Sequence, residues 1–300
     1  MRRTTRFFYG RTVGAGVCLA IAAACTASAS VRLPLGGATA GSEHDAAFQI
    51  ERPCGTARFT TSLTVRIPPG FEVLGAEAPK GWRVDILRIG RGKVRWTAVA
   101  PEAVLVGNER GEFVLRGRVM RTPGTLYFHA LQGCDIGSIE WSEVPGNVAG
   151  EKLVRPAPRL DVLPAGVAPV DIRDGWVRPT VPGQHTTAAY MKLSAPMGSR
   201  LVGIDSPVAG ETGIYIVRIE GDTLQRRPVE GGFPLPARRS IELRPGSYHV
   251  MLFDLKKPLP AGSSVPMTFH FVDAKGTSTS AQVVLPVGMP APKPAPRRSS

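Results

Sequence analysis

Short segments in which apolar and polar residues alternate recur along the chain, and glycine- or proline-containing turns separate them. One example is SLTVRIP at Ser62–Pro68, and later ones are GEFVLRGRV, GIYIVRIE and VPMTFHFVDA. Neighbouring side chains of an extended strand point to opposite faces, so this pattern predicts half-buried β-strands rather than helices. The 34 Gly and 28 Pro residues among 300 supply the turns. We therefore predict an all-β protein made of antiparallel strands.

The number of predicted strands is sufficient for two domains of ordinary size. We expect two antiparallel β-sandwiches, the first over residues 30–159 and the second over 170–288. The segment PAPRLDVLPAGVA at Pro156–Ala168 has the proline, alanine and glycine content of an interdomain connection, so a linker is placed at 160–169. The proline-rich end of the chain, residues 289–300, is predicted to be an extended or disordered tail.

The first 29 residues resemble a secretory signal peptide. Arginines precede an apolar run from about Thr12 to Ala24, and Ala27-Ser28-Ala29 is a small-residue cleavage site. The apolar run is shorter than the ~20 residues needed to cross a bilayer, and no later segment approaches that length. Three alternatives remain: a retained anchor, a twin-arginine route through Arg2-Arg3, and lipidation at Cys25.

The formal net charge of +13 raises the question of nucleic-acid binding. Seven of these charges lie in the predicted signal peptide and tail, which leaves +6 on the remainder. The seven are Arg2, Arg3, Arg6, Arg11, Lys293, Arg297 and Arg298. The other basic residues are scattered through strands and loops, without a basic helix or an aromatic-basic platform. The sequence therefore argues against nucleic acid as a partner and predicts no membrane span in the mature chain.

Cys54 and Cys134 are the only cysteines that remain once the signal peptide is removed. Two cysteines without metal-ligand spacing in an oxidising compartment favour a disulfide. Closing a loop of ~80 residues would stabilise the fold by roughly 4 kcal/mol. The alternative is a free catalytic or redox thiol, although neither cysteine belongs to a CxxC motif.

The segment RPGSYHVMLFDL at Arg244–Leu255 holds the most informative pair of side chains. His249 and Met251 are two residues apart, so a strand places both on one face. Imidazole is a general copper ligand and thioether selects the cuprous ion, so this pair is chemically half of a copper(I) site. Core packing of both side chains is the alternative.

The segment SYHVMLFDLKKPLPAG at Ser247–Gly262 resembles the signature of the periplasmic copper chaperones called PCu(A)C. The resemblance continues through VDIRDGWVRPTVPGQHTTAAYMKL, SPVAG and RRPVEGGFPLPA. It implies a cupredoxin-like barrel and a copper(I) site made of His, Met and the His-x-Met strand. Here Tyr215 stands at the first His position and Arg226 at the Met position, and both are poor cuprous ligands. Met191 is a candidate third ligand if its strand passes near the site, with buried packing as the alternative.

The segments TAGSEHDAAFQIERPCG at Thr39–Gly55, APKGWRVDI and TLYFHALQGCDIGSIEWSEVPG resemble the YcnI-like copper-associated domains, also called DUF1775. In that family the first residue of the mature chain is a His that binds copper(II), assisted by a carboxylate and a nearby tryptophan. Ser30 occupies the His position here, Trp141 matches the tryptophan, and Glu51 is the acid nearest the carboxylate region. His44 is either a substitute ligand or an exposed, incidental histidine.

The two resemblances together predict an exported, periplasmic copper-binding protein that sequesters the ion or acts as a copper chaperone, with altered ligand sets. The metal ligands expected are His249, Met251 and Met191, and the ion favoured at the second domain is copper(I). A copper-accepting respiratory or membrane protein is the expected partner. The competing interpretation is a β-sandwich scaffold or protein-interaction module that binds no metal. An enzyme is not expected, because the five histidines show no motif spacing and the chain lacks a nucleophile elbow or phosphate loop.

Overall fold

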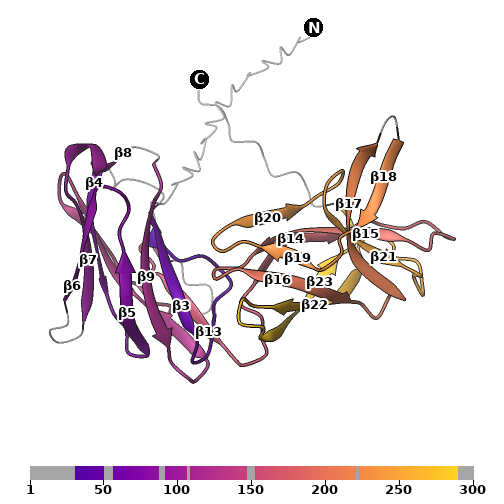
Figure 1. The fold of residues 1–300 in the computed structure, drawn as a ribbon, viewed down its shortest axis with the longest axis horizontal. Helices are drawn as coiled ribbons and strands as arrows, with labels where there is room; N and C mark the ends of the chain where they lie inside the picture. The colour runs from indigo at the N-terminus through magenta and orange to yellow at the C-terminus, as the bar shows by residue number, and fades with distance from the viewer. Residues whose placement is uncertain are drawn as a thin grey trace, which may run out of the picture.

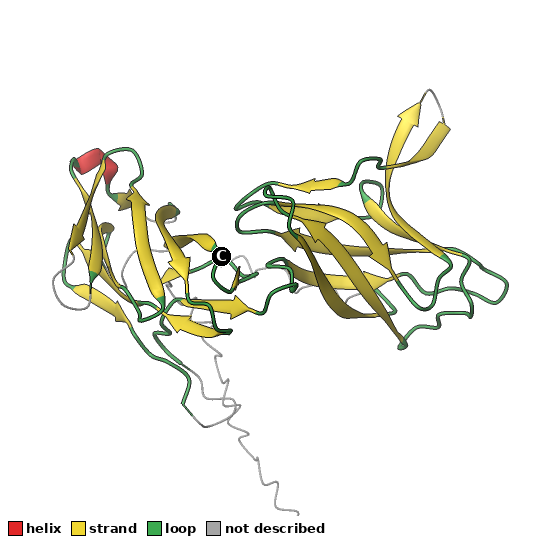
Figure 2. Cartoon of the chain, turned by 60° about the horizontal axis from the view of Figure 1, so that its bottom comes forward, coloured by secondary structure: helices red, strands yellow, loops and turns green. Residues whose placement is uncertain are grey.

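The computed structural model describes residues 31–50, 57–87, 92–106, 109–146, 153–220 and 223–289. The predicted signal peptide at 1–29 and all but the first residue of the predicted tail lie outside these ranges. The described chain is almost entirely β-structure, as Figure 2 shows, with one short 3-10 helix at Pro101–Ala103. This confirms the all-β prediction. The described residues contain no helix long and apolar enough to cross a membrane.

The first thirteen strands form two main sheets and a small third one (Figure 1). One main sheet has the order β1-β3-β9-β5, with β1 at Val31–Arg32, β3 at Glu43–Ile50, β9 at Gly111–Val119 and β5 at Phe71–Glu77. The other has the order β12-β11-β4-β7-β6. Its strands are β12 at Ser138–Trp141, β11 at His129–Cys134, β4 at Phe59–Arg66, β7 at Lys93–Ala98 and β6 at Trp82–Leu87. A short strand, β8 at Leu105–Val106, pairs with β4. The small sheet contains β10 at Gly124–Tyr127, β13 at Arg159–Leu163 and β2 at Ala38–Thr39.

Alternation along the strands builds the core between the two main sheets. In β3 the inward side chains include Phe48 and Ile50, while Asp45 and Gln49 face outward. Phe48 meets Trp96 of the opposite sheet with ring centroids 6.3 Å apart. Fully buried aromatic and aliphatic side chains of this kind make the largest contribution to the stability of a sandwich.

The remaining ten strands form a second pair of sheets. The first has the order β14-β15-β21-β17-β18. Its strands are β14 at Asp171–Val177, β15 at Thr187–Ser194, β21 at His249–Phe253, β17 at Glu211–Glu220 and β18 at Thr223–Pro228. A further strand, β20 at Ser240–Leu243, pairs with β15. The second has the order β19-β16-β22-β23, with β19 at Phe233–Leu235, β16 at Ser199–Asp205, β22 at Ser264–Val272 and β23 at Ser278–Pro286. Their inner faces share one apolar core that includes Val250, Leu252, Phe269 and Phe271.

No sheet of the described chain combines strands from both groups. The predicted linker includes residues 160–163, but these residues belong to β13. Strand β13 pairs antiparallel with β10 and parallel with β2. The segment that crosses between the two groups is therefore shorter than the predicted linker, and the domain boundaries remain a proposal.

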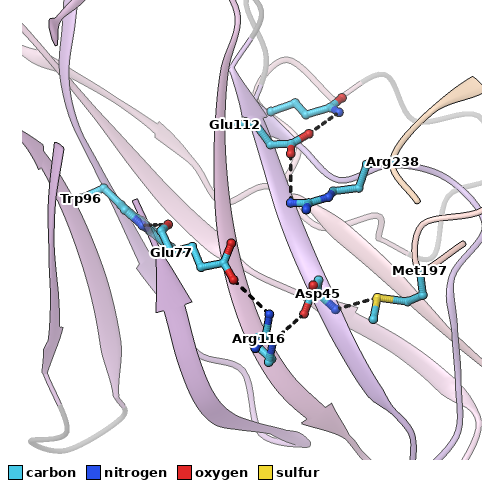
Figure 3. A network of polar contacts seen from close by, with 8 residues as sticks. Asp45, Glu77, Trp96, Glu112, Arg116, Met197 and Arg238 are labelled. Carbon is cyan, nitrogen blue, oxygen red and sulfur yellow. Dashed lines mark hydrogen bonds and ion pairs between the residues drawn. The ribbon is translucent and has the colours of Figure 1, made fainter. Parts of the chain in front are cut away.

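Polar contacts join the two groups of strands (Figure 3). The backbone N–H of Asp45 donates to Sδ of Met197 at 3.1 Å, and Arg238 Nη1 forms an ion pair with Glu112 Oε1 at 3.2 Å. Glu112 lies on β9 of the first group, and Arg238 precedes β20 of the second. The contact is polar and partly exposed, so it contributes little free energy of association.

Candidate metal-binding site

The central strand β21 divides its side chains between two environments. Val250 and Leu252 point into the main core, whereas His249 and Met251 lie on the opposite face of the sheet. Both are nevertheless buried, with 4% and 5% of their surfaces exposed. The structure thus brings the predicted imidazole and thioether to one face of one strand.

A backbone hydrogen bond fixes the imidazole ring of His249. Its Nδ1 lies 2.8 Å from the carbonyl oxygen of Ser247. A carbonyl only accepts, so we assign the proton to Nδ1, which leaves the lone pair on Nε2. Metal-binding histidines are commonly held in this way, with one nitrogen donating to a backbone carbonyl and the other free for the metal.

An aromatic cluster surrounds Met251 on this outer face. Tyr190 and Ala188 are buried with it, and Trp176, Tyr215 and Phe253 pack against them. The ring centroids of Trp176 and Tyr190 are 4.5 Å apart, and those of Tyr215 and Phe253 are 5.4 Å apart. The thioether therefore lies in an apolar environment, which favours a soft, singly charged ion over a hard one.

A bulge in β14 sets the position of Trp176. The pairing with β15 shifts between Arg173 and Trp176, and Asp174 there has a φ of 52°. The shift places Trp176 opposite Tyr190. One irregular residue thus extends the aromatic cluster to the edge of the sheet.

The two positions at which the family ligands are missing lie on this same face. Tyr215 is the direct cross-strand partner of His249. Arg226 stands opposite Val217, two residues beyond Tyr215, and is exposed. Tyr215 is therefore next to His249. Arg226 lies one strand further from β21 and is offset along the sheet away from Met251, whose cross-strand partner is Gly213.

Met191, predicted as a third soft ligand, does not join this area. Its neighbours Ala188 and Ala189 pair with Met251 and Val250, and Met191 falls on the face of Val250. It is 2% exposed within the main core. Met191 therefore packs in the main core, which was the alternative to metal binding. The β15–β21 register places its side chain on the opposite face of the sheet from Met251.

Among the described residues, no three His, Cys, Asp or Glu side chains are grouped so that they could hold a metal ion. The copper(I) hypothesis rests on a different feature, the soft pair of His249 and Met251 on the outer face of β21.

In the first domain the prediction of an exposed His44 is wrong. His44 is 3% exposed, and its Nδ1 has no hydrogen-bond partner among the described residues. Burial lowers the pKa of His44 to about 4, an effect that the charge of Asp45 offsets only in part. His44 lies on β3 with its side chain on the core face, so the ring is neutral and enclosed by apolar residues.

Trp141 lies on β12 of the other sheet and is 2% exposed. Its Nε1 donates to Gln132 Oε1 at 3.2 Å, and Gln132 Nε2 donates to Thr60 Oγ1 at 2.8 Å. The indole is thus held by a buried polar chain. Ser30 and Glu51, the other family positions, lie outside the described residues.

Cys134, at the end of β11, is disulfide-bonded. Cys54 lies outside the described residues, so its pairing with Cys134 stays a prediction.

The aromatic cluster and the contact with the Ser247 carbonyl are not among the features predicted from the sequence. One signal could have revealed the cluster. The run AAYM in β15 is apolar at consecutive positions, and its residues are buried on both faces of the sheet. A strand that is apolar on both faces indicates a second packed layer outside the main core.

Two family models match the chain. "Domain of unknown function (DUF1775)" matches residues 31–162, and "Putative lipoprotein LpqE-like" matches residues 170–283. A curated relative, a protein described as a lipoprotein from Leifsonia xyli subsp. xyli, is 30% identical over 120 residues. The match covers 39% of this chain and 69% of that protein.

Solved structures are similar in parts. An uncharacterized protein from Nocardia farcinica with an immunoglobulin-like fold is 23% identical, over 44% of this chain and 97% of that chain, with a TM-score of 0.38. A copper-bound PCuAC domain is 24% identical, over 41% of this chain and 96% of that chain, with a TM-score of 0.31.

Proposed function

Because the chain belongs to the DUF1775 family over residues 31–162 and to the LpqE-like family over residues 170–283, we propose that it is an exported copper-binding carrier. It binds copper(I) at His249 and Met251 and passes the ion to an acceptor by ligand exchange. The reaction needs no covalent intermediate and no catalytic residue.

The observation that carries this proposal is the geometry of the outer face of β21. The Nδ1 contact with Ser247 leaves the lone pair of His249 on Nε2. Met251 lies on the same face, two residues away. A nitrogen donor and a thioether in apolar surroundings are the ligands that stabilise copper(I).

The proposed location is the periplasmic or outer side of the membrane. Residues 1–29 resemble a signal peptide, and the family model of the second domain describes a lipoprotein. A copper-accepting respiratory or membrane protein is the partner that such a carrier would serve.

The proposed site is weaker than one with four ligands. Tyr215 would have to lose a proton with an ordinary pKa near ~10 before it could bind the ion. Arg226 cannot be deprotonated and adds a positive charge, two strands away, to the face that holds His249. Arg226 is exposed, so solvent screens that repulsion in part.

Competition titration with a copper(I) chelator, in ascorbate, tests the proposal. We expect one copper(I) ion per chain, and at least tenfold tighter binding in the double variant Tyr215→His, Arg226→Met, because the change restores two ligands and removes one charge. A chain that takes no copper(I) from the chelator, with or without this repair, would refute the carrier function.

The first domain gives a separate test with copper(II). Ser30 cannot provide the imidazole of the family, so we expect weak copper(II) binding there and stronger binding after Ser30→His. Tight copper(II) binding by the unmodified chain, with Ser30 confirmed as its first residue, would contradict the residue assignment in that domain.

A second candidate function is a protein-interaction module that binds no metal. The aromatic cluster favours it, since Tyr190, Trp176 and Tyr215 account for the burial of Met251 without an ion. On this alternative, copper(I) should leave the intrinsic tryptophan fluorescence of the chain unchanged.

A further inference from the structure

The outer face of the sheet β12-β11-β4-β7-β6 carries a row of basic side chains that the copper proposal does not use. His129 on β11 is the cross-strand partner of Arg66 on β4, and Arg66 is the partner of Lys93 on β7. The strands β4, β6 and β7 lie on the side of the first domain away from the second (Figure 1). Arg66 and Lys93 are exposed, and His129 is half-buried.

The row has little compensation from acidic groups. Neither Arg66 nor Lys93 forms an ion pair with a described residue. Asp85 on β6 stands opposite Arg95 and pairs with Arg83 at 3.3 Å. Like charges directly opposite each other destabilise a sheet, so the Arg66–Lys93 pair carries a cost that a bound anion would remove.

The row also lies along a hollow in the surface. The hollow has a volume of about 180 Å³, and its polar lining consists of Thr64, Arg66, Lys93, His129 and Glu140. Glu140 is opposite Leu131, two residues from His129, and would oppose an anion at the β12 side of the hollow. On β4 and β7 the hollow is lined by the guanidinium of Arg66, the ammonium of Lys93 and the hydroxyl of Thr64, which are donors that phosphate oxygens accept from.

We propose that this hollow binds a single phosphate group, with Arg66 and Lys93 as its charged ligands and Thr64 as a neutral donor. The volume is sufficient for one tetrahedral oxyanion together with bound water. The group can belong to free phosphate or to an anionic lipid headgroup, since both present the same oxygens.

Amide chemical shifts of the mature chain, followed during a titration with inorganic phosphate, test the proposal. Sodium chloride at equal ionic strength is the control for screening. We expect saturable shifts centred on β4, β7 and β11 with phosphate only, and an affinity about tenfold lower in either Arg66→Gln or Lys93→Gln. Arg83→Gln is the matched control, because Arg83 is on the same face but is already paired with Asp85.

Three further measurements sharpen the result. Glu140→Gln should strengthen phosphate binding, because it removes the one carboxylate of the hollow. Lys93→Gln should raise the melting temperature without phosphate by about 1–3 °C, since it relieves the repulsion from Arg66. Sedimentation with phosphatidylcholine vesicles that contain or lack phosphatidylglycerol identifies the source of the phosphate.

Binding to vesicles that requires Arg66 and Lys93 would assign the site to a lipid headgroup, and phosphate binding without vesicle binding would assign it to a soluble ligand. Equal responses to phosphate and chloride would overturn the proposal. So would a double variant Arg66→Gln, Lys93→Gln that binds phosphate as the wild type does.

Discussion

Each half of the molecule encloses one histidine, and the two differ in what holds the ring. His44 of the first domain points into the core with Nδ1 unpartnered among the described residues, and burial lowers its pKa to about 4. His249 of the second domain lies outside the main core, and its Nδ1 contacts the Ser247 carbonyl. Burial alone therefore does not distinguish the two rings. His249 has a fixed ring with a directed lone pair beside a second soft donor, and for this reason the proposed copper(I) site is at His249.

The largest effect that we expect concerns His44 and pH. In the unfolded chain His44 takes up a proton near pH 6.5, whereas in the folded chain it resists protonation down to about pH 4. The unfolded state therefore binds more protons between these values, and stability falls as the pH decreases from 6.5 to 4. The loss is roughly 3 kcal/mol and is absent above pH 6.5.

Urea unfolding at pH 7 and pH 4.5 checks this expectation. His44→Leu should remove most of the decrease, and His185→Gln should not, because His185 is exposed. An equal decrease in wild type and His44→Leu would show that other groups cause the acid sensitivity.

The next effect concerns the soft pair. Met251→Leu keeps the volume of the side chain, so the free energy of unfolding should change by less than ~1.5 kcal/mol. Copper(I) affinity should fall at least tenfold, because the thioether is lost.

Met191→Leu is the matched control for Met251→Leu, since it changes the same atoms on the other face of the sheet. Its copper(I) affinity should equal that of the wild type in the same chelator competition. Equal losses in the two variants would mean that copper(I) binding depends on packing rather than on Met251.

The smallest effect concerns the contact between the domains. Arg238→Ala removes the ion pair with Glu112, in which the two side chains are 34% and 38% exposed. A partly exposed pair contributes about 0–1 kcal/mol, so thermal unfolding should shift slightly and copper(I) affinity should not change. A clear change in copper(I) affinity would show that the two histidine environments are coupled.

The fold could be predicted from the sequence because the alternation of apolar and polar residues is visible in each strand by itself. In strand β3, for example, the inward residues can be identified from EHDAAFQI without knowing which strand it pairs with. The common face of His249 and Met251 follows in the same way from their spacing of two residues.

The position of Met191 could not be predicted, because it depends on the register between β15 and β21. A shift of one residue would move Met191 to the face of Met251. Likewise, the contact between His249 and the Ser247 carbonyl depends on the local turn before β21. The connection between the domains was predicted from its prolines, but part of it forms β13, because hydrogen bonds with β10 outweigh composition.

X-ray absorption at the copper edge tests the central claim most directly. The sample is the copper(I)-loaded chain in ascorbate, which leaves a protein disulfide intact. We predict both nitrogen and sulfur scatterers in the first coordination shell of the wild type, and loss of the sulfur contribution in Met251→Leu. A sulfur contribution that persists in Met251→Leu, or a wild-type shell without sulfur, would contradict the assignment of copper(I) to His249 and Met251.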